Sequence, residues 1–62
     1  MNADKLLHAI SSIQNYQYTH DTSEDEKTIM NQLLKEGLAQ RTIANNRYFE
    51  LTTLGYEKLI LA

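Results

Sequence analysis

The sequence contains no cysteine, no proline and no tryptophan, and it has only two glycines. Without cysteine, the chain has neither the disulfides of a small secreted protein nor a cysteine-ligated zinc site. Its longest uninterrupted apolar run, Leu59–Ala62, is far shorter than the roughly 20 residues that span a bilayer. The N-terminal residues lack the basic start and long apolar stretch of a signal peptide. We therefore expect a cytoplasmic protein without a membrane segment.

The 62 residues suffice for one domain, residues 1–62, and no internal repeat or linker divides them. With 42% apolar and 23% charged residues, the composition is that of a folded protein despite a mean hydropathy of -0.50. A chain of about this size buries only roughly 60% of its unfolded surface, and its core supplies about 3–5 kcal/mol. A partner chain would add to that stability.

Charge is unevenly distributed along the chain, whose formal net charge is -2. Residues 20–37 carry five acidic and two basic side chains, a sum of -3, whereas residues 38–62 carry three basic and two acidic ones, a sum of +1. We therefore expect any anion-binding surface in the C-terminal half.

Apolar spacing predicts two helices in the first half of the chain. A helix from Ala3 to about Asn15 begins after a cap at Asn2 or Asp4. Residues 16–20 alternate aromatic and β-branched side chains, which favours a short strand. Ser23 and Glu26 have the spacing of a capping box, which starts a helix over residues 24–36. Gly37 is the expected left-handed stop of that helix.

Residues 38–52 predict a β-hairpin with strands 38–44 and 47–52, in which residues 38, 49 and 51 face inward. Asn45 and Asn46 tolerate the positive φ of a two-residue turn, and a three-residue loop with a shifted register is the alternative. The two-residue turn pairs Ala44 with Arg47, Ile43 with Tyr48, Thr42 with Phe49, Arg41 with Glu50 and Gln40 with Leu51.

A last helix is expected over residues 53–61, capped by Thr52 or Thr53. Its predicted buried residues are Leu54, Leu59 and Ile60. Gly55 is costly inside a helix, so we expect another backbone to pack closely against it.

Two phrases, LLKEGL at residues 33–38 and YFELTTLG at residues 48–55, resemble the winged-helix family. In that family the recognition helix commonly ends in Leu-x-x-x-Gly-Leu, and the second wing strand closes in Tyr-x-Leu-Thr-x-x-Gly. Phe49 occupies the tyrosine position here, and Tyr48 stands one place before it. The resemblance covers about residues 24–61, and with the opening MNADKLLHAI the chain looks like small, mostly uncharacterised winged-helix proteins of bacteria and their phages.

The resemblance implies an α+β fold in the order helix, short strand, helix, β-hairpin, helix. Residues 15–23 are too few for the further helix that a full winged helix places before its recognition helix, so we expect a reduced form lacking it. The recognition-helix position begins with Glu24, Asp25 and Glu26, whose carboxylates repel phosphates. We therefore expect the hairpin, rather than this helix, to contact DNA.

Two groups of residues are candidates for binding. The nucleic-acid candidates gather two cations, two amides and an aromatic ring on the hairpin: Arg41, Asn45, Asn46, Arg47 and Tyr48. A structural interpretation is equally simple, because the asparagines form the turn, Arg41 pairs with Glu50 and Tyr48 covers Ile43. The interface candidates are apolar or aromatic side chains that a thin core leaves outside: Tyr16, Tyr18, Ile43, Tyr48, Tyr56 and Leu61.

Catalysis, metals and cofactors find little support in the sequence. His8 and His20 have no metal-ligand spacing, and neither glycine lies in a phosphate-binding loop. Ser11 and Ser12 lie beside His8 without the further groups that a nucleophilic site needs. We expect no enzyme, metal or cofactor, but a small regulatory protein that either binds double-stranded DNA through the hairpin as a homodimer or docks on a larger nucleic-acid-handling protein. The alternative is a protein-interaction module without nucleic-acid contact, whose acidic second helix faces its partner.

Overall fold

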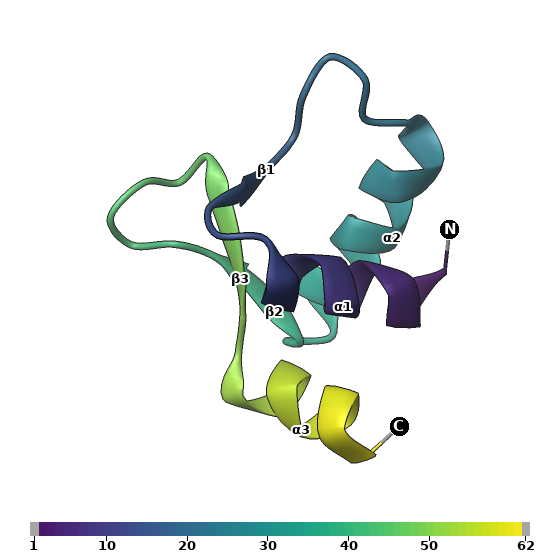
Figure 1. The fold of residues 1–62 in the computed structure, drawn as a ribbon, viewed down its shortest axis with the longest axis vertical. Helices are drawn as coiled ribbons and strands as arrows, with labels where there is room; N and C mark the ends of the chain where they lie inside the picture. The colour runs from purple at the N-terminus through teal and green to yellow at the C-terminus, as the bar shows by residue number, and fades with distance from the viewer. Residues whose placement is uncertain (1, 62) are drawn as a thin grey trace.

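The computed structural model describes residues 2–61, and its elements follow the order helix, strand, helix, hairpin, helix (Figure 1). Three short strands form one antiparallel sheet in the order β1-β3-β2. The α+β class and the expected element order are confirmed. The elements are α1 (Ala3–Ser12), β1 (Tyr16–Gln17), α2 (Glu24–Lys35), β2 (Ala39–Arg41), β3 (Tyr48–Leu51) and α3 (Thr53–Leu61).

Side-chain caps start the first two helices. Asn2 caps α1, where its Oδ1 accepts a hydrogen bond of 2.9 Å from the Lys5 amide. Ser23 caps α2 by accepting one of 3.1 Å from the Glu26 amide. The carboxylate of Glu26 accepts a hydrogen bond from the hydroxyl of Tyr16, which ties α2 to β1.

The two helices end differently from each other. Gly37 has a φ of +77°, and the Leu38 amide donates to the Leu33 carbonyl over 2.9 Å, which closes α2 in a Schellman motif as expected. The expected extent of α1 to Asn15 is wrong, because α1 ends at Ser12. Ile13 already has extended backbone angles, and Asn15 turns the chain toward β1 with a φ of +58°.

The hairpin register differs by one residue from the two-residue-turn prediction. The observed pairs are Ala39 with Leu51, Gln40 with Glu50 and Arg41 with Phe49. The Thr42 amide also donates to the Tyr48 carbonyl over 2.9 Å, so residues 43–47 form the loop. Hydrogen bonds between Thr42 and Asn45 hold Asn45 inside this loop instead of at the corner of a two-residue turn.

The shifted register changes the neighbours of Arg41. Arg41 lies opposite Phe49, and the predicted pairing of Arg41 with Glu50 is wrong. Glu50 instead lies opposite Gln40, whose Nε2 donates to its carboxylate over 3.1 Å. The predicted strand over residues 16–20 is shorter than expected, since only Tyr16 and Gln17 pair with β3.

The core lies between α1, α2 and the sheet (Figure 1). As predicted, residues 38, 49 and 51 point into it. The buried apolar side chains are Leu6, Leu7, Ile10, Tyr16, Met30, Leu33, Leu38, Ala39, Phe49 and Leu51.

Helix α3 packs through a narrow side centred on Gly55. A Cβ atom at Gly55 would lie 2.0 Å from the carbonyl oxygen of Leu38, which confirms the expected close backbone approach. Thr52 caps α3 by accepting a hydrogen bond of 3.0 Å from the Gly55 amide. Of the three predicted buried residues, Leu59 is half-buried, but Leu54 and Ile60 are 52% and 78% exposed, so their predicted burial is wrong. Contact at Gly55 brings this side of α3 close to the backbone of Leu38, while residues on its other sides are exposed to solvent.

Candidate functional site

The loop of the β2–β3 hairpin, residues 43–47, extends away from the body of the molecule (Figure 1). Internal hydrogen bonds fix its shape. The Thr42 hydroxyl donates to the Asn45 carbonyl over 2.5 Å, and the Asn45 side-chain oxygen accepts from the Arg47 amide over 3.0 Å. The loop therefore presents its outward side chains from a backbone that is already ordered.

Arg41 braces this loop from below. Its guanidinium carbon lies 4.6 Å from the centre of the Phe49 ring, a cation–π contact, and its Nη1 donates to the Asn46 carbonyl over 2.9 Å. Burial raises the pKa of the nearby Tyr18 hydroxyl, and the positive charge of Arg41 opposes that rise. Arg41 thus serves the shape of the hairpin, although its side chain is still exposed to solvent.

The remaining predicted nucleic-acid residues divide into outward and inward ones. Arg47 and Asn46 are exposed on the loop, and the Arg47 side chain makes no hydrogen bond or ion pair within residues 2–61. Asn45 and Tyr48 are half-buried, and Asn45 is used in the turn itself. Ile43 is 101% exposed and forms no pair with Tyr48. The outward surface of the loop therefore combines one cation, one amide and one apolar side chain.

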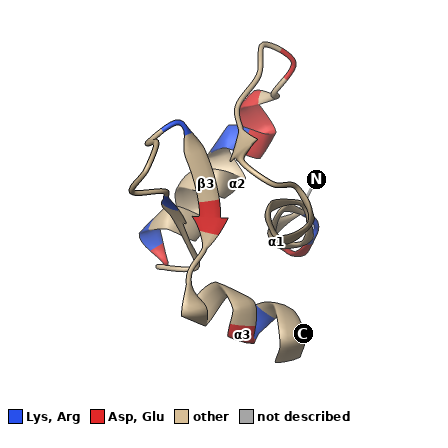
Figure 2. Cartoon of the chain, turned by 60° about the vertical axis from the view of Figure 1, so that its left-hand side comes forward, with Lys and Arg blue, Asp and Glu red and all other residues tan. Residues whose placement is uncertain are grey.

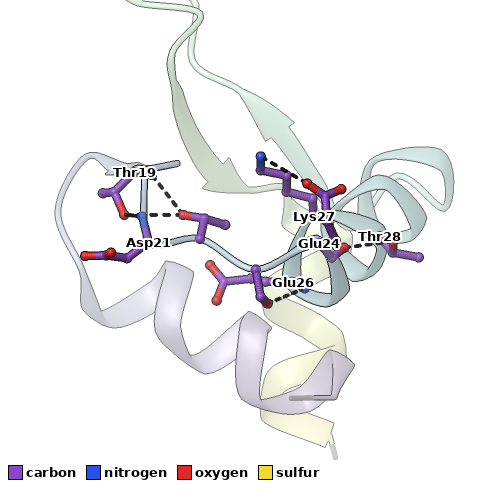
Figure 3. Close-up of polar contacts among 8 residues, drawn as sticks. Thr19, Asp21, Glu24, Glu26, Lys27 and Thr28 are labelled. Carbon is purple, nitrogen blue, oxygen red and sulfur yellow. Dashed lines mark hydrogen bonds and ion pairs between the residues drawn. The ribbon is translucent and has the colours of Figure 1, made fainter.

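The acidic start of α2 lies apart from the hairpin loop (Figure 2). Its polar groups are engaged in local contacts at the helix start (Figure 3). The Glu24 carboxylate lies 3.6 Å from the Lys27 Nζ atom, and the backbone carbonyl of Glu24 accepts a hydrogen bond of 2.9 Å from the Thr28 hydroxyl. Negative charge in the first turn also stabilises the positive end of the helix dipole. This acidic segment therefore has a structural role of its own.

Two of the predicted interface tyrosines belong to the packing around Phe49. Tyr16 is only 7% exposed, and the centre of the Tyr18 ring lies 5.0 Å from that of Phe49. Burial is the largest cause, and the hydrogen bond to Glu26 the second largest, of a pKa of Tyr16 far above its usual value. The structure therefore places these two rings against the core and not on a free surface.

The largest group of exposed apolar side chains lies on α3. Leu61 is 84% exposed and Tyr56 is 48% exposed, as the interface prediction requires, and they are joined there by Leu54 and Ile60. Leu54 and Ile60 are two of the three residues of this helix that the apolar spacing predicts to be buried. The signal that could have found them is that α3 is apolar on almost every side, while its one glycine marks the packed side.

Small-molecule and metal sites find little support among residues 2–61. Two open hollows of about 320 and 340 Å³ flank the end of α1, the first against β1 and Glu26, the second against β3 and Tyr56. Within the same residues no cluster of three or more histidine or acidic side chains is placed to hold a metal ion. No helix in this range is long and apolar enough to span a bilayer.

Compared with known protein families, curated proteins and solved structures, the chain matches none. The hairpin and α3 are therefore the parts of the chain that bear on its function.

Proposed function

We propose that this chain is a small regulatory DNA-binding protein of a reduced winged-helix type, in which the β2–β3 hairpin is the wing. The sheet order β1-β3-β2, with α2 leading into the hairpin, supports this assignment, as do the two phrases at residues 33–38 and 48–55. The helix that usually precedes the recognition helix is absent, since residues 18–23 connect β1 directly to α2.

The observation that carries the proposal is the ordered loop with Arg47 and Asn46 on its outside. Arginine donates hydrogen bonds to phosphate oxygens, and arginine and asparagine also read the edges of bases in the minor groove. The fixed loop backbone lowers the entropy lost when these side chains bind. Arg41 holds the loop by its bond to Asn46 and adds positive charge beneath it.

In this proposal α2 does not read bases. Its first turn carries Glu24, Asp25 and Glu26, and recognition helices contact base edges with residues near their N-terminus. Contact through the hairpin keeps these carboxylates away from the phosphates, because the two lie apart in the fold (Figure 2).

The test is fluorescence anisotropy with a labelled mixed-sequence duplex and the matching single strand, in a salt series from low ionic strength upward. Arg47→Ala should weaken duplex binding and reduce the slope of log K against log salt by about 0.9 for one lost phosphate contact. The control is Lys5→Ala, which removes an exposed cation from α1 and should change neither quantity. The proposal fails if duplex binding is absent at tens of micromolar protein, where non-specific complexes normally form.

The exposed apolar face of α3 favours a second function, association with protein without nucleic-acid contact. Leu54, Ile60 and Leu61 are each more than half exposed on this nine-residue helix. A partner that buried one of these side chains completely would stabilise the protein by about 1.5–3 kcal/mol, which is a large gain for so small a core. Absence of DNA binding, together with a concentration-dependent molecular mass, would favour this second function.

A further inference from the structure

Leu54 and Leu61 form one line along α3. At 3.6 residues per turn, residues seven apart differ by about 20° around the helix, so the two leucines share a side. Gly55 and Leu59 define the packed side. The leucine line points away from it, which agrees with exposures of 52% for Leu54 and 84% for Leu61. It is an apolar stripe that the rest of the fold leaves uncovered.

Two opposite charges flank this stripe. Glu57 and Lys58 follow Leu54 by three and four residues, which puts them about 50° to either side of the leucine line. They are the charged residues of α3 and lie next to each other in Figure 2. Both are exposed, and neither side chain forms a hydrogen bond or ion pair with any residue between 2 and 61. Within residues 2–61, therefore, the leucine line has an unpaired negative charge on one side and an unpaired positive charge on the other, so it is complementary to itself.

We propose that a second copy of this chain covers the stripe, with the two α3 helices side by side and parallel about a two-fold axis. In that arrangement Leu54 and Leu61 meet the same residues of the second copy. The axis also brings Glu57 of each copy to Lys58 of the other, so two ion pairs flank the leucines. An antiparallel pair would place glutamate against glutamate and lysine against lysine. Charge therefore selects the parallel arrangement.

The size of the surface sets the strength of this dimer. A stable interface of standard size buries about 800 Å² on each partner, which is roughly a fifth of the 4430 Å² surface of this chain. A nine-residue helix is about 13 Å long, so one of its sides falls short of that area. We therefore expect a weak dimer that dissociates as the protein is diluted through the micromolar range. The proposal names a second copy of this chain as the partner that covers α3, and, if the first proposed function holds, such a dimer carries two hairpins to a duplex.

The test is sedimentation equilibrium of the full chain across that concentration range. The wild type should move from 7.2 kDa toward twice that mass. Glu57→Lys and Lys58→Glu each turn both ion pairs into repulsions, which should raise the dissociation constant about tenfold in either variant alone. An equimolar mixture of the two variants restores opposite charges across the axis and should dimerise as tightly as the wild type. Glu36→Lys, which changes an exposed charge at the end of α2, is the control and should have no effect.

Because the chain has no cysteine, a single introduced cysteine reports the orientation. Leu54→Cys should oxidise to a disulfide-linked dimer, since equivalent positions meet only in the parallel pair. A disulfide that forms only when Leu54→Cys is mixed with Leu61→Cys would overturn the parallel arrangement, as would a variant mixture tighter than the wild type. A wild type that stays at 7.2 kDa overturns self-association and leaves the DNA proposal standing, because duplex binding is measured separately.

Discussion

Replacing Gly55 by alanine sets two effects of opposite sign against each other. Helix propensity alone favours alanine by about 1 kcal/mol inside α3. The new Cβ would lie 2.0 Å from the carbonyl oxygen of Leu38, whereas ordinary contacts begin at 3.4 Å. The obstacle is backbone, and the same carbonyl accepts the Thr52 amide over 3.1 Å, so α3 must move away from the sheet. Overpacking of this kind typically costs about 1–3 kcal/mol, and severe overlaps cost more.

We therefore expect Gly55→Ala to lower the free energy of unfolding by about 1–2 kcal/mol, with the steric cost outweighing the propensity gain. For a chain of this size that corresponds to a fall in Tm of roughly 5–15 °C, measurable by circular dichroism at 222 nm. Thr53→Ala changes an exposed position of the same helix and serves as the control, with a Tm close to that of the wild type. A Tm that rises in Gly55→Ala would refute the close packing of α3 on Leu38.

Two further predictions concern the end of α2 and its link to β1. Gly37→Val should lower Tm by roughly 5–15 °C, because a β-branched residue resists the φ of +77° even though open space surrounds the site. An unchanged Tm would mean that α2 ends differently. Tyr16→Phe removes the hydrogen bond to Glu26 and should cost about 1–3 kcal/mol at neutral pH, measured by urea unfolding. The raised pKa of Tyr16 means that the unfolded chain loses this proton first, so wild-type stability should fall as pH rises above about 10. Tyr16→Phe should show a smaller fall, and equal slopes in the two proteins would contradict the assignment.

The sequence predicted elements well wherever a local signal sets them. The capping signal correctly placed the start of α2 at Ser23, and the glycine signal correctly placed its left-handed stop at Gly37. The predicted last helix, residues 53–61, also has the observed bounds. Gly55 also predicted a close backbone contact, because little else makes a glycine favourable inside a helix.

Long-range features were predicted less well. The hairpin register depended on bonds from the Thr42 side chain to Asn45, which compete with a two-residue turn without changing the apolar pattern. Because α3 has apolar residues on almost every side, apolar spacing cannot distinguish its buried side from its exposed sides. The predicted burial of Leu54 and Ile60 is therefore wrong. Among the candidate binding residues, Arg47 and Asn46 lie on the surface as a binding role requires, whereas Arg41 is turned toward Phe49 by the register that the sequence left open.

The proposal that the hairpin loop binds DNA is tested most directly by an NMR titration of the ¹⁵N-labelled chain with a short duplex at low salt. Amide shift changes should concentrate at residues 42–48, with those of Arg47 and Asn46 among the largest, and they should shrink as salt is added. Changes centred on the start of α2 would contradict it, since base reading would then occur through the acidic helix. An unchanged spectrum at tens of micromolar protein would contradict DNA binding altogether.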